Sequence, residues 1–510
     1  MADDDDDVRL RRLAHAVLQP GFEGTRAPDW LLDRLADGLG SVLLFARNVD
    51  AADPGQLAEL TATLRSANPD VIVAIDEEGG DVTRIEAATG SSYPGNLALG
   101  AVDDEELTEQ VARSLGRRLA RVGIDLDYAP VVDVNSNPNN PIIGVRSFGC
   151  DPELVARHAG AWVRGLQGAG VGACAKHFPG HGDTDIDSHH ALPTVHATVA
   201  ELRDVALPPF RAAIDGGVRA IMVGHLLLPT IDATVAASVS RPVTTSLLRE
   251  ELGFSGLIVT DAMEMRAVAD RYGLERAVVM AVAAGADLVC IGHTANDELV
   301  GRLQATLVNA VDDGELAEKR LVEAARKVAE FAAGRSASSP EDPDGGDADG
   351  DGDGEIGLAA ARRALRIEVR DARSLPLKAP PHLMSLSTSA GPAALGKSVT
   401  ETSLSTQLAA RFPGMTHATL RACDEAAIDH AVADAAGRPL VLAVRSAHRH
   451  PGMLAALDRL LDRRPDAIVV EMGLPGTSPR PAARIVAFGA GRACATAVAE
   501  ALAQGTDLWC

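Results

Sequence analysis

The stretch VGACAKHF, residues 171–178, runs directly into PGHGDTDIDSHHALP, residues 179–193. The first segment is small or apolar almost throughout, which is typical of a strand buried on both faces of a parallel sheet. The second segment is rich in Gly, Asp and His, and it follows the strand as a loop. A buried strand that ends in a polar loop is the repeating feature of folds that alternate parallel strands with helices.

The same alternation recurs through the first 335 residues. Apolar runs of strand length stand at 41–46 (SVLLFA), 71–76 (VIVAID), 124–134 (IDLDYAPVVDV), 219–226 (RAIMVGHL), 256–262 (GLIVTDA) and 286–292 (ADLVCIG). Each is followed by an amphipathic segment rich in Ala and Leu, and a further strand is expected near HAVLQPGF, residues 15–22. Strands and helices in this number predict an α/β fold, a (β/α)8 barrel of the TIM type over residues 1–334.

A compositional break follows, with GRSASSPEDPDGGDADGDGDGEIG at residues 334–357. We expect residues 335–357 to form an acidic, disordered linker, because such a segment has too few apolar residues to fold. Asp349, Asp351 and Asp353 resemble the start of a calcium-binding loop. The twelfth position of that loop is Ala360 instead of Glu, so a linker is favoured over a calcium site.

Residues 358–510 return to the alternation of strands and helices. Strand-like runs at 439–445 (PLVLAVR), 466–473 (DAIVVEMG) and 483–489 (ARIVAFG) are separated by helical segments. They predict a smaller α/β sandwich domain, with weaker strand signals near its start. Support of the barrel is the favoured role of this domain. The alternatives are a loop lent to the active site and the binding of another partner.

The composition disfavours several classes of protein. With 46% apolar residues the chain is globular, yet no run approaches the about 18 consecutive apolar residues of a membrane-spanning helix. The acidic start, MADDDDD, lacks the basic region of a signal peptide, so a cytoplasmic location is expected. A net charge of −23 disfavours nucleic-acid binding, and six scattered cysteines without a CxxC pair disfavour disulfides and thiolate-bound zinc.

One interpretation of the loop after residue 178 is a metal site. His177 and His181 have the spacing of a helical pair of metal ligands, but Pro179 and Gly180 between them break such a helix. The Asp and His side chains of this loop could still bind a metal without a helix. A metal-dependent hydrolase therefore stays open as an alternative.

Asp187 and His189 favour a second interpretation, a catalytic loop. The carboxylate stands two residues before the imidazole, close enough to fix its tautomer and raise its basicity. A His held in this way can act as a general acid and base near neutral pH. Ser188 is a poor nucleophile candidate, because no Gly-x-Ser-x-Gly elbow surrounds it.

Charged residues follow strands elsewhere in the predicted barrel. Asp261 comes directly after an apolar run, although it could instead cap a helix that begins near Met263. Asp76 ends another run. Taken singly, such residues are more often structural, but acids and cations gathered at several strand ends suit a ligand rich in hydroxyl groups. The further candidates of this kind are Arg84, Arg146, Lys176 and His177.

Four motifs carry a resemblance to a known family. They are IDEEGGDVTR (75–84), RSFG (146–149), KHFPGHGDTDIDSHHALP (176–193) and TDAMEM (260–265). In this order, across about residues 10–335, they resemble the motifs of bacterial β-N-acetylhexosaminidases of glycoside hydrolase family 3. The resemblance implies a (β/α)8 barrel, and some members of that family carry a second α/β sandwich domain.

The resemblance also implies roles for the residues that match in type. Asp261 falls on the family's nucleophile, His189 on its acid/base, and Asp187 on the residue that forms a dyad with that histidine. Glu77 and Asp81 depart from the family and make this loop unusually acidic, which weakens the expectation of an extended, charged substrate. No cofactor and no metal is implied. The positions that hold the sugar's hydroxyl groups are matched by Asp76, Arg84, Arg146, Lys176 and His177.

These matches imply a retaining, exo-acting β-N-acetylglucosaminidase that removes terminal β-linked N-acetylglucosamine through a covalent intermediate on Asp261. Three alternatives stay open: a phosphorylase that transfers the sugar to inorganic phosphate, a metal-dependent hydrolase, and a barrel that binds sugar without catalysis. The expected partner is a carbohydrate, with neither nucleic acid nor membrane. The group attached to the sugar stays open among a muropeptide sugar of peptidoglycan recycling, a chitin fragment and a glycoconjugate.

Overall fold

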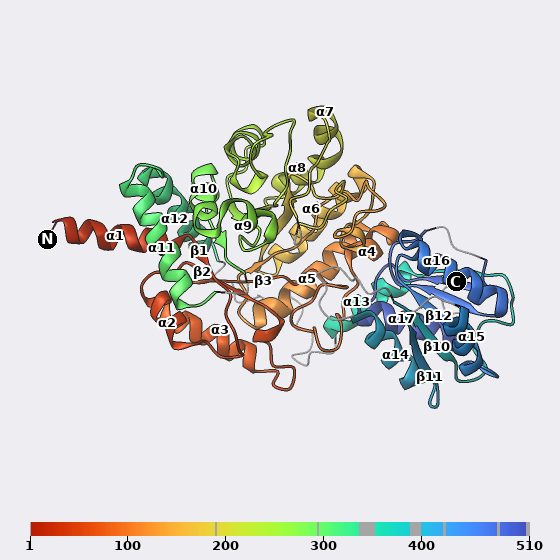
Figure 1. Cartoon of the computed structure of the whole chain (residues 1–510). Helices are drawn as coiled ribbons and strands as arrows, with labels where there is room; N and C mark the ends of the chain where they lie inside the picture. The colour runs from red at the N-terminus through yellow and green to blue at the C-terminus, as the bar shows by residue number, and fades with distance from the viewer. Residues whose placement is uncertain are drawn as a thin grey trace. The chain divides into compact units, whose positions relative to one another are not determined.

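The computed structural model describes residues 2–188, 191–292, 295–335, 352–387, 399–421, 425–476 and 480–505. Contacts between residues divide the chain into two compact units (Figure 1). The barrel unit comprises Met1–Glu77, Thr108–Ile143 and Cys150–Gly346. The sandwich unit comprises Glu78–Leu107, Gly144–Gly149 and Asp347–Cys510.

The barrel unit is built on short parallel strands. Two sets are hydrogen-bonded within themselves, a six-stranded sheet in the order β2-β3-β4-β5-β6-β7 and a pair, β1-β8. The amide of Leu43 donates to the carbonyl of Pro20 at 3.1 Å, and that of Thr260 donates to the carbonyl of Leu288 at 3.1 Å, which joins the sets into a closed barrel. The strands are β1 (Leu18–Gln19), β2 (Ser41–Leu44), β3 (Ile72–Ile75), β4 (Leu126–Asp127), β5 (Gly172–Phe178), β6 (Ala220–Val223), β7 (Leu257–Thr260) and β8 (Val289–Cys290).

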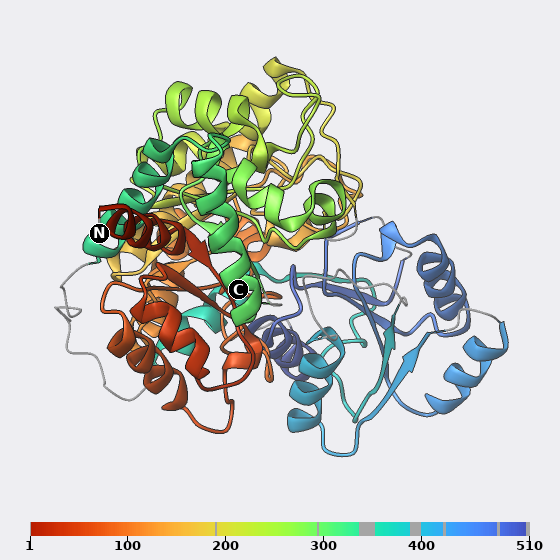
Figure 2. The ribbon, with the colours of Figure 1, turned by 60° about the vertical axis from the view of Figure 1, so that its left-hand side comes forward.

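Helices surround these strands, and the predicted (β/α)8 barrel is confirmed (Figure 2). None of the helices in the described ranges has the length and apolarity needed to cross a membrane. The helix that begins at Pro152 has a regular start, because Asp151 accepts a hydrogen bond from the amide of Glu153 and Pro152 fills the first position. The longer helices are α1 (Ala2–Ala16), α2 (Asp29–Ala36), α3 (Gln56–Ala67), α5 (Glu105–Arg121), α6 (Pro152–Gly168), α8 (Pro208–Asp215), α10 (Leu274–Ala284), α11 (Asp297–Asp312) and α12 (Glu318–Ala333).

The interior of the barrel is a packed apolar core. Alternate residues of successive strands contribute to one cluster, among them Ile72, Leu126, Cys174 and Met222. Phe331 of α12 belongs to the same cluster. Because side chains fill the interior, the chemistry of the barrel unit is confined to the residues at the ends of its strands.

The sandwich unit contains one six-stranded sheet, in the order β11-β10-β12-β13-β14-β9. Its neighbouring strands are parallel except for β9, which runs antiparallel to β14. The predicted runs at 439–445, 466–473 and 483–489 contain β12 (Leu440–Val444), β13 (Ile468–Glu471) and β14 (Ala483–Val486). The sheet is completed by β9 (Arg366–Val369), β10 (His382–Leu386) and β11 (Thr416–Leu420).

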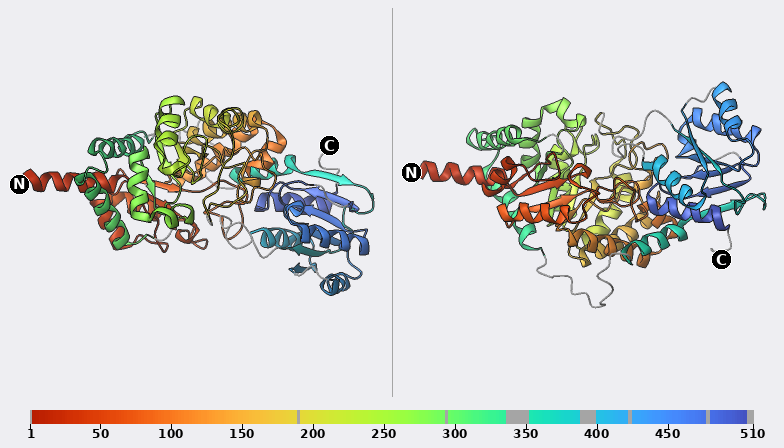
Figure 3. Two further views of the ribbon diagram at one scale, coloured as in Figure 1. Left: turned by 45° about the horizontal axis from the view of Figure 1, so that its top comes forward. Right: turned by 90° about the horizontal axis from the view of Figure 1, so that it is seen from below.

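Helices cover both faces of this sheet, as the α/β sandwich prediction requires (Figure 3). On one face, α13 (Gly352–Ala364), α14 (Val399–Arg411) and α17 (Arg492–Gln504) share an apolar cluster with Val441, Val470 and Ile485. On the other face, α15 (Glu425–Asp434) and α16 (Pro451–Arg463) pack against Leu442 and Val469.

The sandwich unit also takes in two segments that leave the barrel sequence. One segment, 78–107, contains α4 (Asn96–Val102), and the other, 144–149, contains the 3-10 turn η2 (Gly144–Arg146). Ala98 of α4 packs with Ala364 and Phe488, which accounts for the grouping. The contacts therefore divide the chain differently from the single cut at residue 334 that composition suggests.

The expected linker, residues 335–357, falls only partly within the described residues. Residues 336–351 lie outside them, and these include Asp349 and Asp351 of the calcium-like motif. Residues 352–357 form the first turns of α13.

Candidate active site

Asp76 and Lys176 form an ion pair at the strand ends of the barrel unit. Asp76 follows β3 and Lys176 lies in β5, so one strand, β4, separates their elements. Lys176 Nζ lies 2.7 Å from Asp76 Oδ1, and the lysine side chain is only 2% exposed against 18% for the aspartate. A buried ammonium group needs a charged partner, and the partly exposed carboxylate keeps acceptor capacity for a ligand.

His177, the next residue of β5, is held by a carboxylate that the sequence did not single out. Its Nδ1 lies 2.7 Å from Oδ2 of the fully buried Asp133. Asp133 also accepts from the amide of His181 at 2.7 Å. Burial acts to raise the pKa of Asp133, but the charge and hydrogen bond of His177 outweigh it and the pKa is lowered. Asp133 is therefore an ionised anchor that fixes Nδ1 of His177 as the protonated nitrogen.

His181 lies fully buried in the loop after β5. Its Nδ1 is 2.7 Å from Thr184 Oγ1 and its Nε2 is 3.1 Å from Ser188 Oγ. Burial, with the nearby charge of His177, lowers the pKa of His181 to about 4, so the ring is neutral at neutral pH. Gly182 lets the loop pass closely, because a Cβ there would lie 1.7 Å from the carbonyl oxygen of Val134. His181 is thus an internal tie of the loop.

This geometry bears on the metal interpretation. Both ring nitrogens of His181 face hydroxyl groups, and Nδ1 of His177 faces Asp133. Within the described ranges, no group of three or more His, Cys, Asp or Glu side chains could hold a metal ion. His189 and His190 lie outside those ranges.

Asp187, the predicted partner of the acid/base, is buried at the end of the same loop and is 8% exposed. Its carbonyl accepts from the amide of Ala191 at 3.2 Å, and the neighbouring Ser188 is the residue that contacts His181. His189, the predicted acid/base, lies outside the described residues. The Asp187–His189 dyad therefore stays a prediction.

Asp261, the predicted nucleophile, directly follows β7 and is partly exposed. Its amide donates to the carbonyl of Val223 at 3.0 Å, and its Oδ1 accepts from the amide of Ala262 at 2.8 Å. The next helix, α9 (Arg266–Tyr272), begins three residues beyond the expected start, and its N-cap, Met265, makes no side-chain capping bond. Asp261 is therefore not the cap of that helix.

His225 is a further residue of this region that sequence reasoning missed. It follows β6 and is fully buried. Its Nδ1 lies 2.8 Å from Ser238 Oγ, and its Nε2 lies 2.9 Å from the carbonyl oxygen of Ala262. The imidazole thus holds the peptide group next to Asp261. The available signal was a histidine directly after an apolar run, in RAIMVGHL.

Asp127, the last residue of β4, was also missed. Its Oδ1 accepts from the amide of Glu77 at 2.8 Å, and among the described residues its buried Oδ2 has no hydrogen-bond partner. Burial raises the pKa of Asp127 well above its usual value, and the charge of Asp76 acts in the same direction. Asp127, below the loop that begins at Asp76, therefore keeps its proton to a higher pH than an ordinary Asp.

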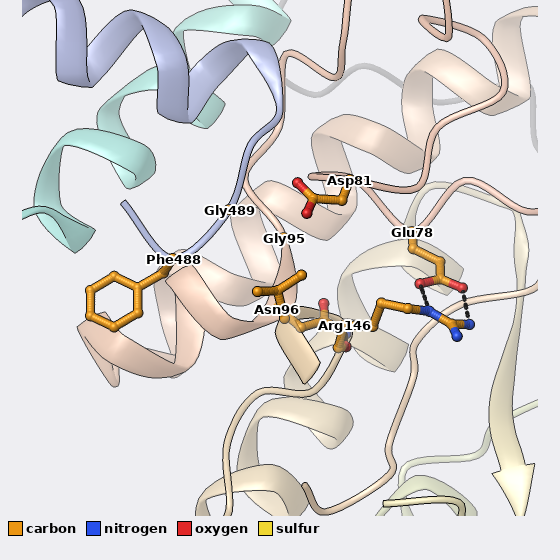
Figure 4. A pocket seen from close by; sticks show the side chains of 9 residues that line it. Glu78, Asp81, Gly95, Asn96, Arg146, Phe488 and Gly489 are labelled. Carbon is orange, nitrogen blue, oxygen red and sulfur yellow. Dashed lines mark hydrogen bonds and ion pairs between the residues drawn. The ribbon is translucent and has the colours of Figure 1, made fainter. Parts of the chain in front are cut away.

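Arg84 and Arg146, the remaining predicted sugar-binding residues, belong to the sandwich unit. Arg146 makes a bidentate pair with Glu78, with Nε 2.9 Å from Oε2 and Nη2 2.8 Å from Oε1 (Figure 4). Its carbonyl accepts from Asn96 Nδ2 at 2.7 Å. Arg84 is half-buried. The pocket in Figure 4 is lined by Glu78, Gly79, Asp81, Gly95, Asn96, Val145, Arg146, Phe488 and Gly489.

The two acidic departures, Glu77 and Asp81, are both buried. The amide of Glu77 donates to Asp127, and the Glu77 side chain is buried. Asp81 forms an ion pair with Arg445, and its Oδ1 accepts from the amide of Ala490 at 2.6 Å. The charge of Asp81 is therefore balanced inside the sandwich unit.

Known proteins resemble the chain over most of the barrel sequence. Residues 26–331 match the glycosyl hydrolase family 3 N terminal domain. A beta-hexosaminidase A of Pseudoalteromonas piscicida is 35% identical over 318 residues, which cover 58% of this chain and 53% of that protein. A beta-hexosaminidase of Neisseria meningitidis serogroup C is 38% identical over 268 residues, 51% of this chain and 73% of that protein. The match thus spans about half the length of the P. piscicida relative.

A solved structure extends the likeness to both units. It is that of a glycoside hydrolase family 3 beta-N-acetylglucosaminidase from Paenibacillus sp. str. FPU-7, with a TM-score of 0.84 and 32% sequence identity. The alignment covers 97% of this chain and 96% of that one. Because the family match over residues 26–331 covers more than half of the chain, the chain belongs to glycosyl hydrolase family 3.

Proposed function

We propose that the protein is a retaining, exo-acting β-N-acetylglucosaminidase that removes terminal β-linked N-acetylglucosamine. The observation that carries this proposal is the placement of Asp261, which follows β7 without serving as a helix cap. The same unit holds the Asp76–Lys176 pair and the loop that contains Asp187. The likeness to the Paenibacillus enzyme over nearly the full length of both chains supports the choice of sugar.

In the first step, the carboxylate of Asp261 attacks the anomeric carbon as the bond to the leaving oxygen breaks. The proton that the leaving oxygen needs comes from the imidazolium of His189. Asp187 stabilises that imidazolium and orients the ring. The product of this step is a glycosyl ester on Asp261.

In the second step, water attacks the same carbon while neutral His189 takes its proton, and the ester bond to Asp261 breaks. Two inversions leave the configuration of the sugar unchanged. The catalytic pair is thus a carboxylate and an imidazole, in place of the two carboxylates of most glycosidases.

Sugar binding falls to the charged groups at the strand ends. Lys176 donates to a hydroxyl oxygen while Asp76 accepts from a hydroxyl group, and their mutual contact fixes both before the sugar arrives. His177, held by Asp133, adds a ring nitrogen of fixed tautomer. Arg84 and Arg146 are the further donors in this proposal.

Nitrophenyl β-N-acetylglucosaminide tests the proposal. We expect release of nitrophenol at a rate that neither phosphate nor a chelator changes, with β-N-acetylglucosamine as the first sugar product by NMR. Asp261→Asn should lower turnover by about three orders of magnitude or more, about 4 kcal/mol in the barrier, while the thermal midpoint stays the same.

Other outcomes point to the alternatives. Formation of the sugar 1-phosphate with a rate that rises with phosphate identifies a phosphorylase. Loss of activity with a chelator identifies a metal-dependent hydrolase. Binding of N-acetylglucosamine without any turnover identifies a sugar-binding protein. The cytoplasmic location stays a prediction, which cell fractionation tests.

A further inference from the structure

We infer that the C-terminal part of the sandwich unit positions the sugar-binding arginines. The contact of Asp81 with Arg445 and Ala490 is the main link between the segment that carries Arg84 and this C-terminal part. This inference rests on the proposed function, which assigns Arg84 and Arg146 to the sugar. It gives the C-terminal part of the chain a role in substrate affinity beyond support of the barrel.

Two segments of the sandwich unit come from the part of the sequence that forms the barrel. Segments 78–107 and 144–149 lie between barrel strands in the sequence, yet their contacts group them with residues 347–510. Each segment carries one of the two arginines. The contacts that fix the conformation of these segments within the sandwich unit therefore also fix the positions of Arg84 and Arg146.

Asp81 provides the first attachment, three residues before Arg84. Its side chain is 3% exposed, and it pairs with the guanidinium group of Arg445, which follows β12. Its other oxygen accepts from the amide of Ala490 at 2.6 Å. A buried carboxylate with these two partners cannot shift without losing both, because an unpaired buried charge is strongly destabilising.

The backbone conformation of Phe488 orients the amide of Ala490 towards Asp81. Its φ of 57° lies in the left-handed region that disfavours residues other than glycine. Its ring is kept in place by Ala98, Ala364 and Val486. Strained backbone of this kind persists only where the surroundings hold it, and here it leads the chain through Gly489 to the amide that meets Asp81 (Figure 4).

Arg492 provides a second attachment, on the other side of Arg84. It forms an ion pair with Glu86, and its Nε donates to the carbonyl of Gly90 at 3.2 Å. The amide of Ala493 donates to the carbonyl of Ser91 at 3.0 Å. Arg84 thus lies between two points at which the start of α17 and the turn before it hold the segment.

Arg146, the second arginine, is held by Glu78 of segment 78–107. The bidentate Glu78–Arg146 pair joins the two segments, with side chains 4% and 9% exposed. Asn96 of α4 holds the carbonyl of Arg146 as well. Asp81, Arg445 and Arg492 are therefore positioning residues, since they act on the sugar through Arg84 and Arg146.

Kinetics of the full-length protein with nitrophenyl β-N-acetylglucosaminide test the inference. Asp81→Asn keeps an oxygen for the Ala490 amide but removes the charge, and Arg445→Met removes the partner. Each should raise KM about tenfold with kcat within about twofold, because a misplaced binding group weakens ground-state and transition-state binding alike. The inhibition constant of free N-acetylglucosamine should rise by the same factor. The double variant should resemble either single variant, since both break one contact.

Two further variants separate positioning from plain destabilisation. Glu500→Gln weakens the ion pairs of the mostly buried Glu500 with Arg362 and Arg411 in the same unit, and should lower the thermal midpoint with KM unchanged. Arg445→Lys keeps the positive charge, so its KM should be closer to the wild-type value than that of Arg445→Met. Comparison of these two variants tests the inference even if Asp81→Asn does not fold.

An active wild type whose Asp81 and Arg445 variants keep the wild-type KM overturns the inference and leaves the proposed function standing. A wild-type protein that does not cleave the glycoside, and whose thermal midpoint N-acetylglucosamine does not raise, overturns both the inference and the proposed function.

Discussion

Lys176 and Asp76 meet at 2.7 Å although 100 residues separate them in the chain. The lysine is almost fully buried and the aspartate is the more exposed of the two. Such a pair is pre-formed for a hydroxyl group, because its donor and acceptor are fixed before a ligand binds.

Lys176→Met removes the ammonium group that lies 2.7 Å from Asp76 Oδ1. We expect a loss of about 3–5 kcal/mol in the free energy of unfolding, because one charge is removed from a mostly buried pair. We also expect kcat/KM to fall about 100-fold, or about 2.7 kcal/mol. Urea unfolding and glycoside kinetics measure the two effects. The matched control is Asp76→Asn combined with Lys176→Met, which should regain stability without activity; a double variant as unstable as Lys176→Met would contradict the assignment.

His225→Phe keeps a ring of similar size but removes the bonds to Ser238 and to the carbonyl of Ala262. Because that carbonyl belongs to the residue after Asp261, we expect kcat to fall about tenfold to 100-fold with little change in KM. Ser238→Ala, which removes only the outer bond, should lower kcat much less. Equal kcat values for wild type and His225→Phe would show that the imidazole serves packing alone.

His181 predicts a pH dependence of stability. Its folded pKa of about 4 is below the ordinary value of 6.5, so between these two pH values the unfolded chain binds a proton that the folded protein does not. Stability is therefore complete above pH 6.5 and is lost as the pH falls towards 4. Unfolding by urea across this window should show a shallower slope for His181→Gln. His430→Gln, a change at an exposed side chain of α15, should leave the slope as it is.

Asp127 predicts the opposite dependence. Burial raises its folded pKa, so as the pH rises past 3.8 the unfolded chain loses a proton that the folded protein keeps, and stability falls. Asp127→Asn imitates the neutral carboxyl group and keeps an oxygen for the amide of Glu77. We expect the variant to unfold at the same or a higher temperature than wild type at pH 8, with a flatter profile down to pH 5. A lower midpoint for the variant at pH 8 would mean that Asp127 is ionised in the folded protein.

The strands of the barrel could be predicted from sequence because most of their residues are apolar, a pattern typical of a parallel sheet covered on both faces. The edge strands β9 and β11 of the sandwich could not, since they carry exposed and polar residues such as Glu368 and His417. Their strand character comes from pairing with β14 and β10. Tertiary context decides at such edges.

The candidate site divides in a similar way. Asp261 and Lys176 could be predicted from their positions at strand ends, together with the family resemblance. Asp133 could not, because its role depends on a histidine 44 residues further along the chain. The contact of Asp81 was equally hidden, since nothing in the loop sequence points to Arg445 or Ala490.

The separation between Asp81 and Ala490 has a consequence for synthesis of the protein. Asp81 leaves the ribosome 409 residues before the amide that it binds, and Glu86 leaves 406 residues before Arg492. Segment 78–107 therefore keeps its carboxylates and the apolar side of α4 exposed until α17 has been synthesised. Contacts so distant in sequence slow folding and prolong the exposure of aggregation-prone surface. A chain cut after the barrel sequence would keep that surface uncovered permanently.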